Sequence, residues 1–162
     1  MLNTRGYSLG PIQTNCYIVS NKEKECLIFD PGEEGAKLVK EIRAKNLKPL
    51  AILLTHAHFD HIGAVDALRE VFELPVYIHE KEVSWLADPM KNGSGKYAEL
   101  PNYIVKAPEE AHILRKEQQL KIGTFIFDAV FTPGHSPGSI SYVFNCLLYT
   151  SPSPRDVEES RM

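Results

Sequence analysis

The sequence predicts a mixed α/β fold, in which strands alternate with helices in the middle of the chain and strands dominate on either side. Within residues 26–79, short apolar runs alternate with segments of helical period. Residues 1–30 contain two apolar runs, 16–19 and 26–29, separated by a polar stretch that indicates a hairpin. A second hairpin pattern surrounds Gly123-Thr124. Together these features favour mixed sheets covered by helices over an all-parallel doubly wound sheet.

Two segments have the apolar spacing of amphipathic helices. The first lies in residues 33–45 and ends before Pro49. The second runs from about Asp60 to Phe72. We expect its apolar residues to face inward, namely Ile62, Val65, Leu68, Val71 and Phe72. Between them, residues 50–54 form a continuous apolar run, as expected for a strand buried on both faces.

The second half of the chain is predicted to contain shorter elements. The expected elements are a strand at 76–79, a helix from Lys81 to Asp88, a surface loop over 89–103, a hairpin at 120–127 and a final strand at 139–144. We expect the loop to cover a binding site or simply to lie on the surface. No internal repeat is evident.

Composition and charge indicate a globular domain without a nucleic-acid or membrane partner. The chain has 162 residues and a formal net charge of -3, with no basic stripe of the kind that nucleic-acid binding needs. No apolar run approaches the roughly 20 residues of a membrane span. Cys16 and Cys26 lie in apolar runs and form no CxxC pair, so we expect buried thiols and a cytoplasmic location. Nothing indicates an obligate protein partner.

The strongest chemical signal is a group of metal-binding side chains that directly follows the apolar strand. His56 and His58 are two residues apart, so on extended backbone they project to the same side. Asp60 and His61 follow where the chain turns into a helix, and His135 lies in a distant Gly/Pro-rich loop. Three His ligands with an open position are typical of catalytic zinc, whereas structural zinc sites close with four ligands, usually including Cys. The pattern therefore predicts a catalytic metal site.

Three further residues have simpler interpretations. His79 and His112 stand alone and are interpreted as structural or exposed. Asp30, at the end of a strand in Asp30-Pro31-Gly32, is either a simple turn residue or a partner that orients a ligand His.

The segments GPIQTNCY (10–17), THAHFDHIGA (55–64) and TPGHSPGSIS (132–141) resemble the metallo-β-lactamase-fold hydrolases. They are most similar to the compact glyoxalase II-like branch, the hydroxyacylglutathione hydrolase-like enzymes. The resemblance implies an αββα sandwich, of which this chain holds about the N-terminal two-thirds. It also implies that His56, His58 and His135 hold a first metal ion, and that Asp60 and His61 hold a second.

The resemblance implies hydrolysis of an acyl-thioester, such as S-lactoylglutathione, by a metal-bound hydroxide. Zinc lowers the pKa of bound water to about 7, and Asp60 would orient the nucleophile as well as bind metal. One or two Zn²⁺ ions are expected, with iron or manganese as alternatives that the same ligands accept. The alternatives of the same fold are a lactonase, a β-lactamase, a nuclease and an iron-dependent persulfide dioxygenase. A non-catalytic metal-binding protein is the alternative of another class.

The sequence departs from the resembled family after the last motif. That family continues with a Gly-Asp strand, whose Asp bridges the two metals, and then a final His. Here no His follows His135, and the single Asp after Asp128 is Asp156. We therefore expect the chain to bind at most one metal ion tightly, to fold poorly and to be impaired as an enzyme, with hydrolysis belonging to the full-length parent.

The last residues have a different character from the rest of the chain. From Cys146 to Asp156 they match, in register, a translation of adaptor DNA used in transposase-based sequencing libraries. The alternative is a natural Ser/Pro-rich tail. We therefore divide the sequence into a truncated domain over residues 1–145 and a non-native, adaptor-derived segment over residues 146–162.

Overall fold

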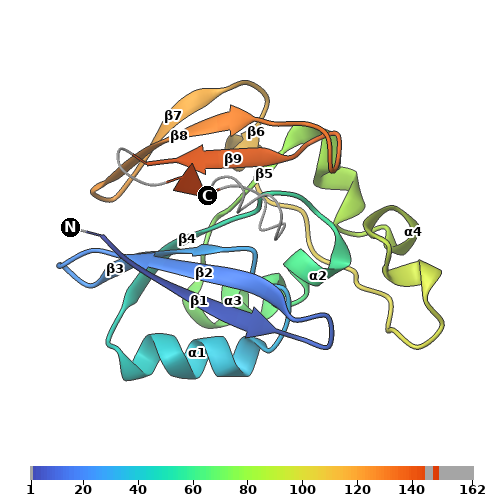
Figure 1. Ribbon diagram of the computed structural model, residues 1–162, viewed down its shortest axis with the longest axis horizontal. Coiled ribbons are helices and arrows are strands. Elements are labelled where there is room, and N and C mark those ends of the chain that lie inside the picture. The colour runs from blue at the N-terminus through green and yellow to red at the C-terminus, as the bar shows by residue number, and fades with distance from the viewer. Residues whose placement is uncertain (1, 145–147, 150–162) are drawn as a thin grey trace.

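Two β-sheets packed face to face form the centre of the computed structural model, which describes residues 2–144 and 148–149 (Figure 1). The first sheet has six strands in chain order: β1 (Asn3–Leu9), β2 (Thr14–Ser20), β3 (Glu25–Phe29), β4 (Lys48–Leu53), β5 (Val76–His79) and β6 (Ile113–Leu114). The second has four, in the spatial order β10 (Leu148–Tyr149), β9 (Ile140–Val143), β8 (Phe125–Phe131) and β7 (Gln118–Ile122).

The helices pack against the outer face of the first sheet or lie at its edge (Figure 1). The α-helices are α1 (Gly35–Ala44), α2 (Phe59–Ile62), α3 (Val65–Phe72) and α4 (Pro89–Asn92). The 3-10 helices are η1 (Glu80–Trp85), η2 (Ser94–Lys96) and η3 (Glu110–His112). In the described part of the chain no helix covers the outer face of the second sheet, where Ile126 is 48 % exposed.

The first sheet changes from antiparallel to parallel at β3. Strands β1, β2 and β3 pair antiparallel, and the hairpin predicted between the apolar runs of β2 and β3 is confirmed. Strands β3, β4, β5 and β6 pair parallel. Parallel neighbours need a crossover connection, which α1 supplies between β3 and β4, and α2 with α3 between β4 and β5. The mixed α/β fold predicted from the sequence is thus confirmed.

Two apolar cores lie on opposite faces of the first sheet. Because side chains alternate along a strand, Ile52 of β4 and Leu54 beyond its end face α1 and α3, while Ala51 and Leu53 face the second sheet. All four are fully buried, which confirms that this strand is covered on both faces. The core between the sheets combines aliphatic side chains with a group of aromatic rings, and these rings include Phe29, Phe125, Phe127, Tyr142 and Phe144.

The helix predicted from Asp60 to Phe72 is broken into α2 and α3. The break follows from packing, because the N–H of Ala64 donates to the carbonyl of Pro31 at 2.9 Å. A Cβ on Gly63 would lie 2.2 Å from the carbonyl oxygen of Gly32, so only glycine permits this approach. The expected inward orientation of Val71 is wrong, since 42 % of its surface is exposed.

Two further predictions differ from the structure. The helix expected over 81–88 is the 3-10 helix η1, and the loop expected over 89–103 contains α4 and η2. The boundary proposed between residues 145 and 146 falls outside the described residues. Among those that the structure describes, no helix has the length and apolar character needed to cross a membrane.

Candidate metal centre

The side chains of the predicted site gather where the parallel strands of the first sheet end. Asp30 follows β3, and His56 follows β4 after two residues. Glu82 follows β5, on η1. In open α/β sheets ligands bind beyond the carboxyl ends of parallel strands, and the candidate site has this position. His135 reaches it from the loop between β8 and β9 of the second sheet.

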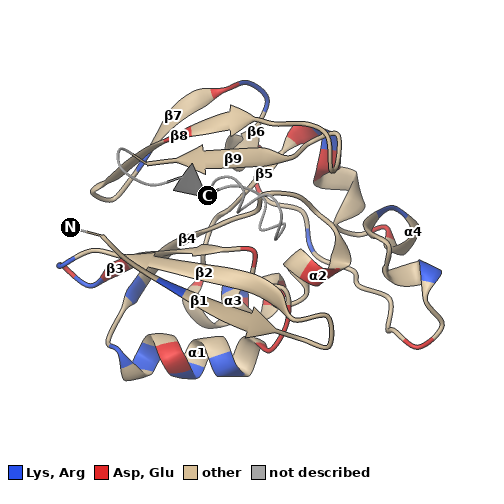
Figure 2. Ribbon diagram, in the orientation of Figure 1, with Lys and Arg blue, Asp and Glu red and all other residues tan. Residues whose placement is uncertain are grey.

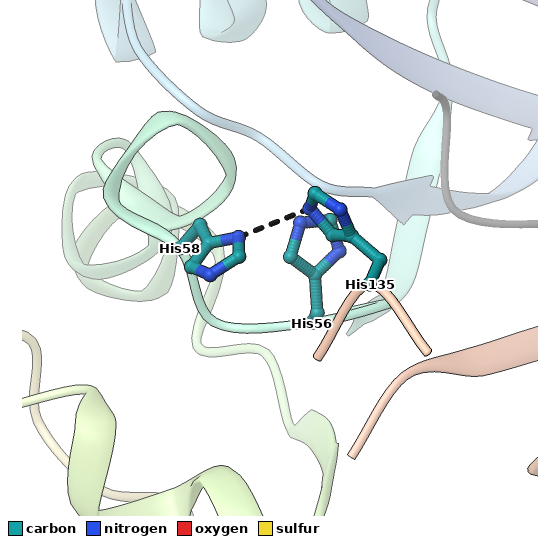
Figure 3. A group of neighbouring side chains, drawn as sticks. All are labelled: His56, His58 and His135. Carbon is teal, nitrogen blue, oxygen red and sulfur yellow. Dashed lines mark hydrogen bonds between the residues drawn. The ribbon is translucent and has the colours of Figure 1, made fainter. Parts of the chain in front are cut away.

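The three histidines assigned to a first metal form a close cluster (Figure 3). One ring nitrogen from each of His56, His58 and His135 lies within 4.8 Å of the other two. Nδ1 of His58 and Nε2 of His135 are 3.2 Å apart. The ring centroid of His56 lies 4.8 Å from that of His58 and 4.6 Å from that of His135. The structure therefore brings together residues that are 79 positions apart in the chain (135 − 56).

Burial keeps two of these imidazoles neutral near pH 7. Desolvation of His56, followed by the nearby His61, His58 and His135, lowers its pKa well below the ordinary value. Desolvation and His135 also lower the pKa of His58. A neutral imidazole offers the lone pair that a metal ion needs, so His56 and His58 can bind metal without first losing a proton.

A second cluster joins Asp30, His56 and His61, all buried. Asp30 Oδ1 accepts from the Thr55 N–H at 2.8 Å, and Oδ2 accepts from Thr55 Oγ1 at 2.5 Å. Oδ2 also lies 3.1 Å from Nδ1 of His61. These contacts favour the interpretation of Asp30 as a residue that orients a histidine over that of a simple turn residue.

Asp60 lies between His61 of the second cluster and Thr14 of β2. Its Oδ2 is 3.5 Å from Nε2 of His61 and accepts a hydrogen bond from Thr14 Oγ1 at 2.8 Å. Desolvation opposes a charge on His61, but Asp30, Asp60 and Glu82 outweigh it and raise its pKa. In the absence of metal, a proton therefore competes for His61 more strongly than for His56.

Glu82 is a site residue that sequence reasoning did not find. Its fully buried carboxylate joins the two loops that carry the histidines. Oε1 accepts from the N–H of Ala57 at 2.7 Å, between His56 and His58. Oε2 accepts from the hydroxyl of Ser136 and from the N–H of Gly138 at 2.7 Å. A buried charge needs such partners, but a Glu in a charged run gives no such signal in the sequence.

The loop that carries His135 is also fixed by its backbone. The N–H of Thr132 donates to the carbonyl of Ser139, and the N–H of Ile140 donates to the carbonyl of Thr55, both at 2.9 Å. A Cβ on Gly138 would lie 2.9 Å from Cγ of Glu82. The glycine therefore permits this loop to approach η1 closely.

The two isolated histidines have structural contacts. His79 is buried, and its Nδ1 accepts from the N–H of Lys81 at the start of η1. The ring of His112 packs on Tyr77, with centroids 4.9 Å apart. Neither belongs to a possible metal cluster among the described residues.

Two cavities differ in their relation to the site. A pocket of about 320 Å³ has His58, Asp60 and His135 in its wall. A larger one, of about 520 Å³, lies between the β1–β2 hairpin and α1 and includes none of the metal-binding side chains. The smaller pocket is therefore the candidate substrate site, because it opens onto the histidine cluster.

Comparison with known proteins identifies the class. Residues 9–147 match the metallo-beta-lactamase superfamily, and the chain belongs to this superfamily. Over 138 residues it is 51 % identical to "Probable metallo-hydrolase YqgX" of Bacillus subtilis, covering 85 % of this chain and 64 % of that protein. Over 131 residues it is 30 % identical to hydroxyacylglutathione hydrolase GloC of Haemophilus influenzae, covering 81 % and 61 %. The chain thus spans less than two thirds of the length of these relatives.

Solved structures support the same fold. The chain is 51 % identical to BLEG-1, described as a B3 metallo-beta-lactamase, with a TM-score of 0.84 over 89 % of this chain and 68 % of that one. It is 36 % identical to TTHA1623, solved in a di-iron-bound form, with a TM-score of 0.61 over 86 % and 66 %. The chain therefore has the metallo-β-lactamase fold predicted from its motifs.

Proposed function

We propose that the protein is a metal-dependent hydrolase of acyl-thioesters, of the hydroxyacylglutathione hydrolase-like kind. The observation that supports this most directly is the cluster of His56, His58 and His135 at the wall of an open pocket. Three imidazoles that leave one side open to solvent have the form of a catalytic rather than a structural site. The similarity to GloC of Haemophilus influenzae supports the thioester substrate.

The donor atoms fit a metal ion such as zinc. Imidazole nitrogens suit zinc and iron alike, and no thiol lies among the clustered groups. We propose that His56, His58 and His135 hold the ion, and that Asp60 and His61 contribute to a second position. A bound ion would supply a Lewis acid and an activated water for attack on a carbonyl. Zinc is the proposed ion, and the di-iron form of TTHA1623 supports iron as the alternative.

Other residues of the chain position the groups that would bind metal or react. Thr14 holds the Asp60 carboxylate in place, so that Asp60 can orient a nucleophilic water and accept its proton. Asp30 orients His61 from the opposite side. Glu82 fixes the two histidine-bearing loops relative to each other. The pocket beside the cluster admits the thioester.

A β-lactamase is the second candidate. The specific observation in its favour is the similarity to BLEG-1, at 51 % identity and a TM-score of 0.84. Both substrates present a carbonyl to the same kind of site, so the fold alone does not choose between them.

One assay separates these candidates. Zinc-loaded and iron-loaded forms of this chain, and of the product of the full reading frame, are given S-lactoylglutathione or nitrocefin, with His58→Ala as the control. We expect metal-dependent release of free thiol from the thioester by the full-length product, weaker release by this chain, and loss of the release in the variant. Hydrolysis of nitrocefin alone would favour the β-lactamase. Metal binding without hydrolysis of either compound would overturn the proposal and favour a non-catalytic metal-binding protein.

A further inference from the structure

The pocket beside the histidine cluster is bordered by two lysine side chains that the proposed reaction does not use. His58 and His135 form one part of its wall, and Lys91 and Lys96 form another. Apolar side chains also line the pocket: Ile12, Phe59 and Tyr97. The pocket therefore offers metal-binding nitrogens, an apolar surface and two ammonium groups to one ligand.

The two ammonium groups are available to a ligand. Among the ion pairs of the described residues, none includes Lys91 or Lys96. Nζ of Lys91 lies 3.4 Å from Oγ of Ser84, a neutral partner. Asp60 is the one acid among the described lining residues, and its contacts are with Thr14 and His61. Figure 2 shows the basic residues on α4 and on η2, the 3-10 helix that follows it.

The segment that carries both lysines is held by a buried polar network. Asn92 is fully buried, and its Nδ2 donates to the carbonyls of Trp85 and Tyr103 at 2.9 and 3.0 Å. Its Oδ1 accepts from the N–H and hydroxyl of Ser94. Oγ of Ser94 accepts in turn from the N–H of Tyr103 at 2.9 Å. The backbone beneath the lysines is thus fixed in place, as a binding site requires.

We propose that Lys91 and Lys96 form a subsite for a carboxylate on the part of the substrate that does not react. The inference rests on the proposed function and narrows it to thioesters of an anionic thiol. With the acyl carbonyl at the histidine cluster, the thiol portion would cross the apolar surface and end at the lysines. Ammonium groups attract a carboxylate as point charges, without the fixed geometry of arginine.

Trp85 provides a direct measurement of binding. It is the single tryptophan of the chain, and its ring centroid lies 5.6 Å from that of His58. Its fluorescence should therefore respond to metal and then to a thiol that binds the metal. The probes are glutathione, which has two carboxylates, and glutathione diethyl ester, in which both are neutralised. Dissociation constants of the zinc-loaded chain for the two probes give the preference for the anion.

We expect the chain to bind glutathione about three- to ten-fold more tightly than the diester, because each exposed charge pair contributes a modest amount. The preference should fall at high salt, which screens exposed charges. The double variant Lys91→Ala with Lys96→Ala should bind both probes equally. As the matched control, Lys37→Ala with Lys40→Ala on α1 removes two exposed lysines away from the pocket and should keep the full preference.

Two results would overturn the subsite. One is equal binding of both probes, or no binding of either, by the zinc-loaded chain. The other is a preference that survives in the double lysine variant. These outcomes are separate from the test of the reaction. Tighter binding of glutathione without thioester hydrolysis would support the lysine subsite and overturn the proposed reaction. Thioester hydrolysis with equal binding of both probes would support the reaction and overturn the subsite.

Discussion

The Glu82 carboxylate has a role at the residue scale that its position in the sequence does not reveal. It is fully buried and accepts three hydrogen bonds, one from the His56–His58 loop and two from the loop of His135. Each loop reaches the site from a different sheet. This side chain therefore helps to set the distance between the first two histidines and the third, together with the hydrogen bond from the Ile140 N–H to the Thr55 carbonyl.

Replacing Glu82 with Gln should lower zinc affinity by about 10- to 100-fold, the usual effect of losing a group that orients ligands. The amide would direct a donor at the Ser136 hydroxyl or the Gly138 N–H, both of which now donate to the carboxylate. Zinc titrations followed by Trp85 fluorescence measure the change.

The matched control for this variant is Glu80→Gln on the same 3-10 helix. Glu80 is exposed and pairs with Arg115, and exposed ion pairs contribute little. We expect Glu80→Gln to keep the zinc affinity of the parent. Equal affinities for all three proteins would contradict a positioning role for Glu82.

The buried thiols predict how stability changes in alkali. Burial raises the pKa of Cys26 to about 12, and burial followed by Asp30 raises that of Cys16 well above its ordinary value. In the unfolded chain a thiol ionises near pH 8.5. The unfolded state therefore loses protons first, so stability is complete below about pH 8.5 and declines as pH rises toward 12.

Urea unfolding at pH 7.5 and 9.5 should show a lower midpoint at the higher pH. Cys26→Ala should have a smaller pH dependence, whatever its stability at pH 7.5, because one titrating group is gone. Both proteins should carry Cys146→Ser, so that Cys146 does not titrate. If the urea midpoint of the Cys26 variant changed with pH as much as that of the parent, the Cys26 thiol would not be the titrating group.

At the scale of elements, the turn after β3 determines where α2 lies. A Cβ on Gly32 would be 1.8 Å from the carbonyl oxygen of Asp60. The variant Gly32→Ala must therefore push α2, with Asp60 and His61, away from the turn. We expect a loss of at least about 2 kcal/mol in the free energy of unfolding, within the range for overpacked interiors. Urea denaturation measures it.

Gly6→Ala provides the comparison for that variant. A Cβ on Gly6 would meet only the ring of Tyr17, at 3.2 Å, and a ring edge can shift where a carbonyl cannot. Its effect should stay within about 1 kcal/mol. Similar losses for both glycines would show that the turn after β3 has no special constraint.

The elements that the sequence predicted correctly are those with a strong local pattern. The apolar run of β4 and the hairpin of β7 and β8 both depend on spacing within a few residues. The break after α2 depends instead on contact between Gly32 and Gly63, which are 31 positions apart (63 − 32). The contacts of Glu82 likewise come from distant loops, and no periodicity within one sequence encodes them.

At the scale of the whole molecule, the adaptor origin of residues 146–162 is a prediction about the gene. An independent read across the codon of Asn145 should continue into a different sequence, with a Gly-Asp strand and a later His. The physical reason is that a second metal position needs ligands beyond Asp60 and His61. A read that continues into Leu147 and Leu148 would contradict the adaptor origin and leave a natural tail.

The same site joins the two sheets, since His56 and His58 extend from the first and His135 from the second. A metal ion held by all three should therefore link the sheets and stabilise the folded chain. At a free zinc concentration 100 times the dissociation constant, binding to the native state adds about 2.7 kcal/mol. For a chain of this size that corresponds to a rise of about 5–10 °C in the melting temperature.

His135→Ala should remove most of this rise and leave the melting temperature of the metal-free chain nearly unchanged, because the His135 side chain is exposed. Thermal unfolding with and without zinc measures both effects, and metal analysis should find one tightly bound ion for each chain. A full rise in the variant would show that the ion is held by the first sheet alone. Two tightly bound ions would show that Asp30, Asp60 and His61 complete a second site with no further ligand, since their clustered side chains would then be sufficient.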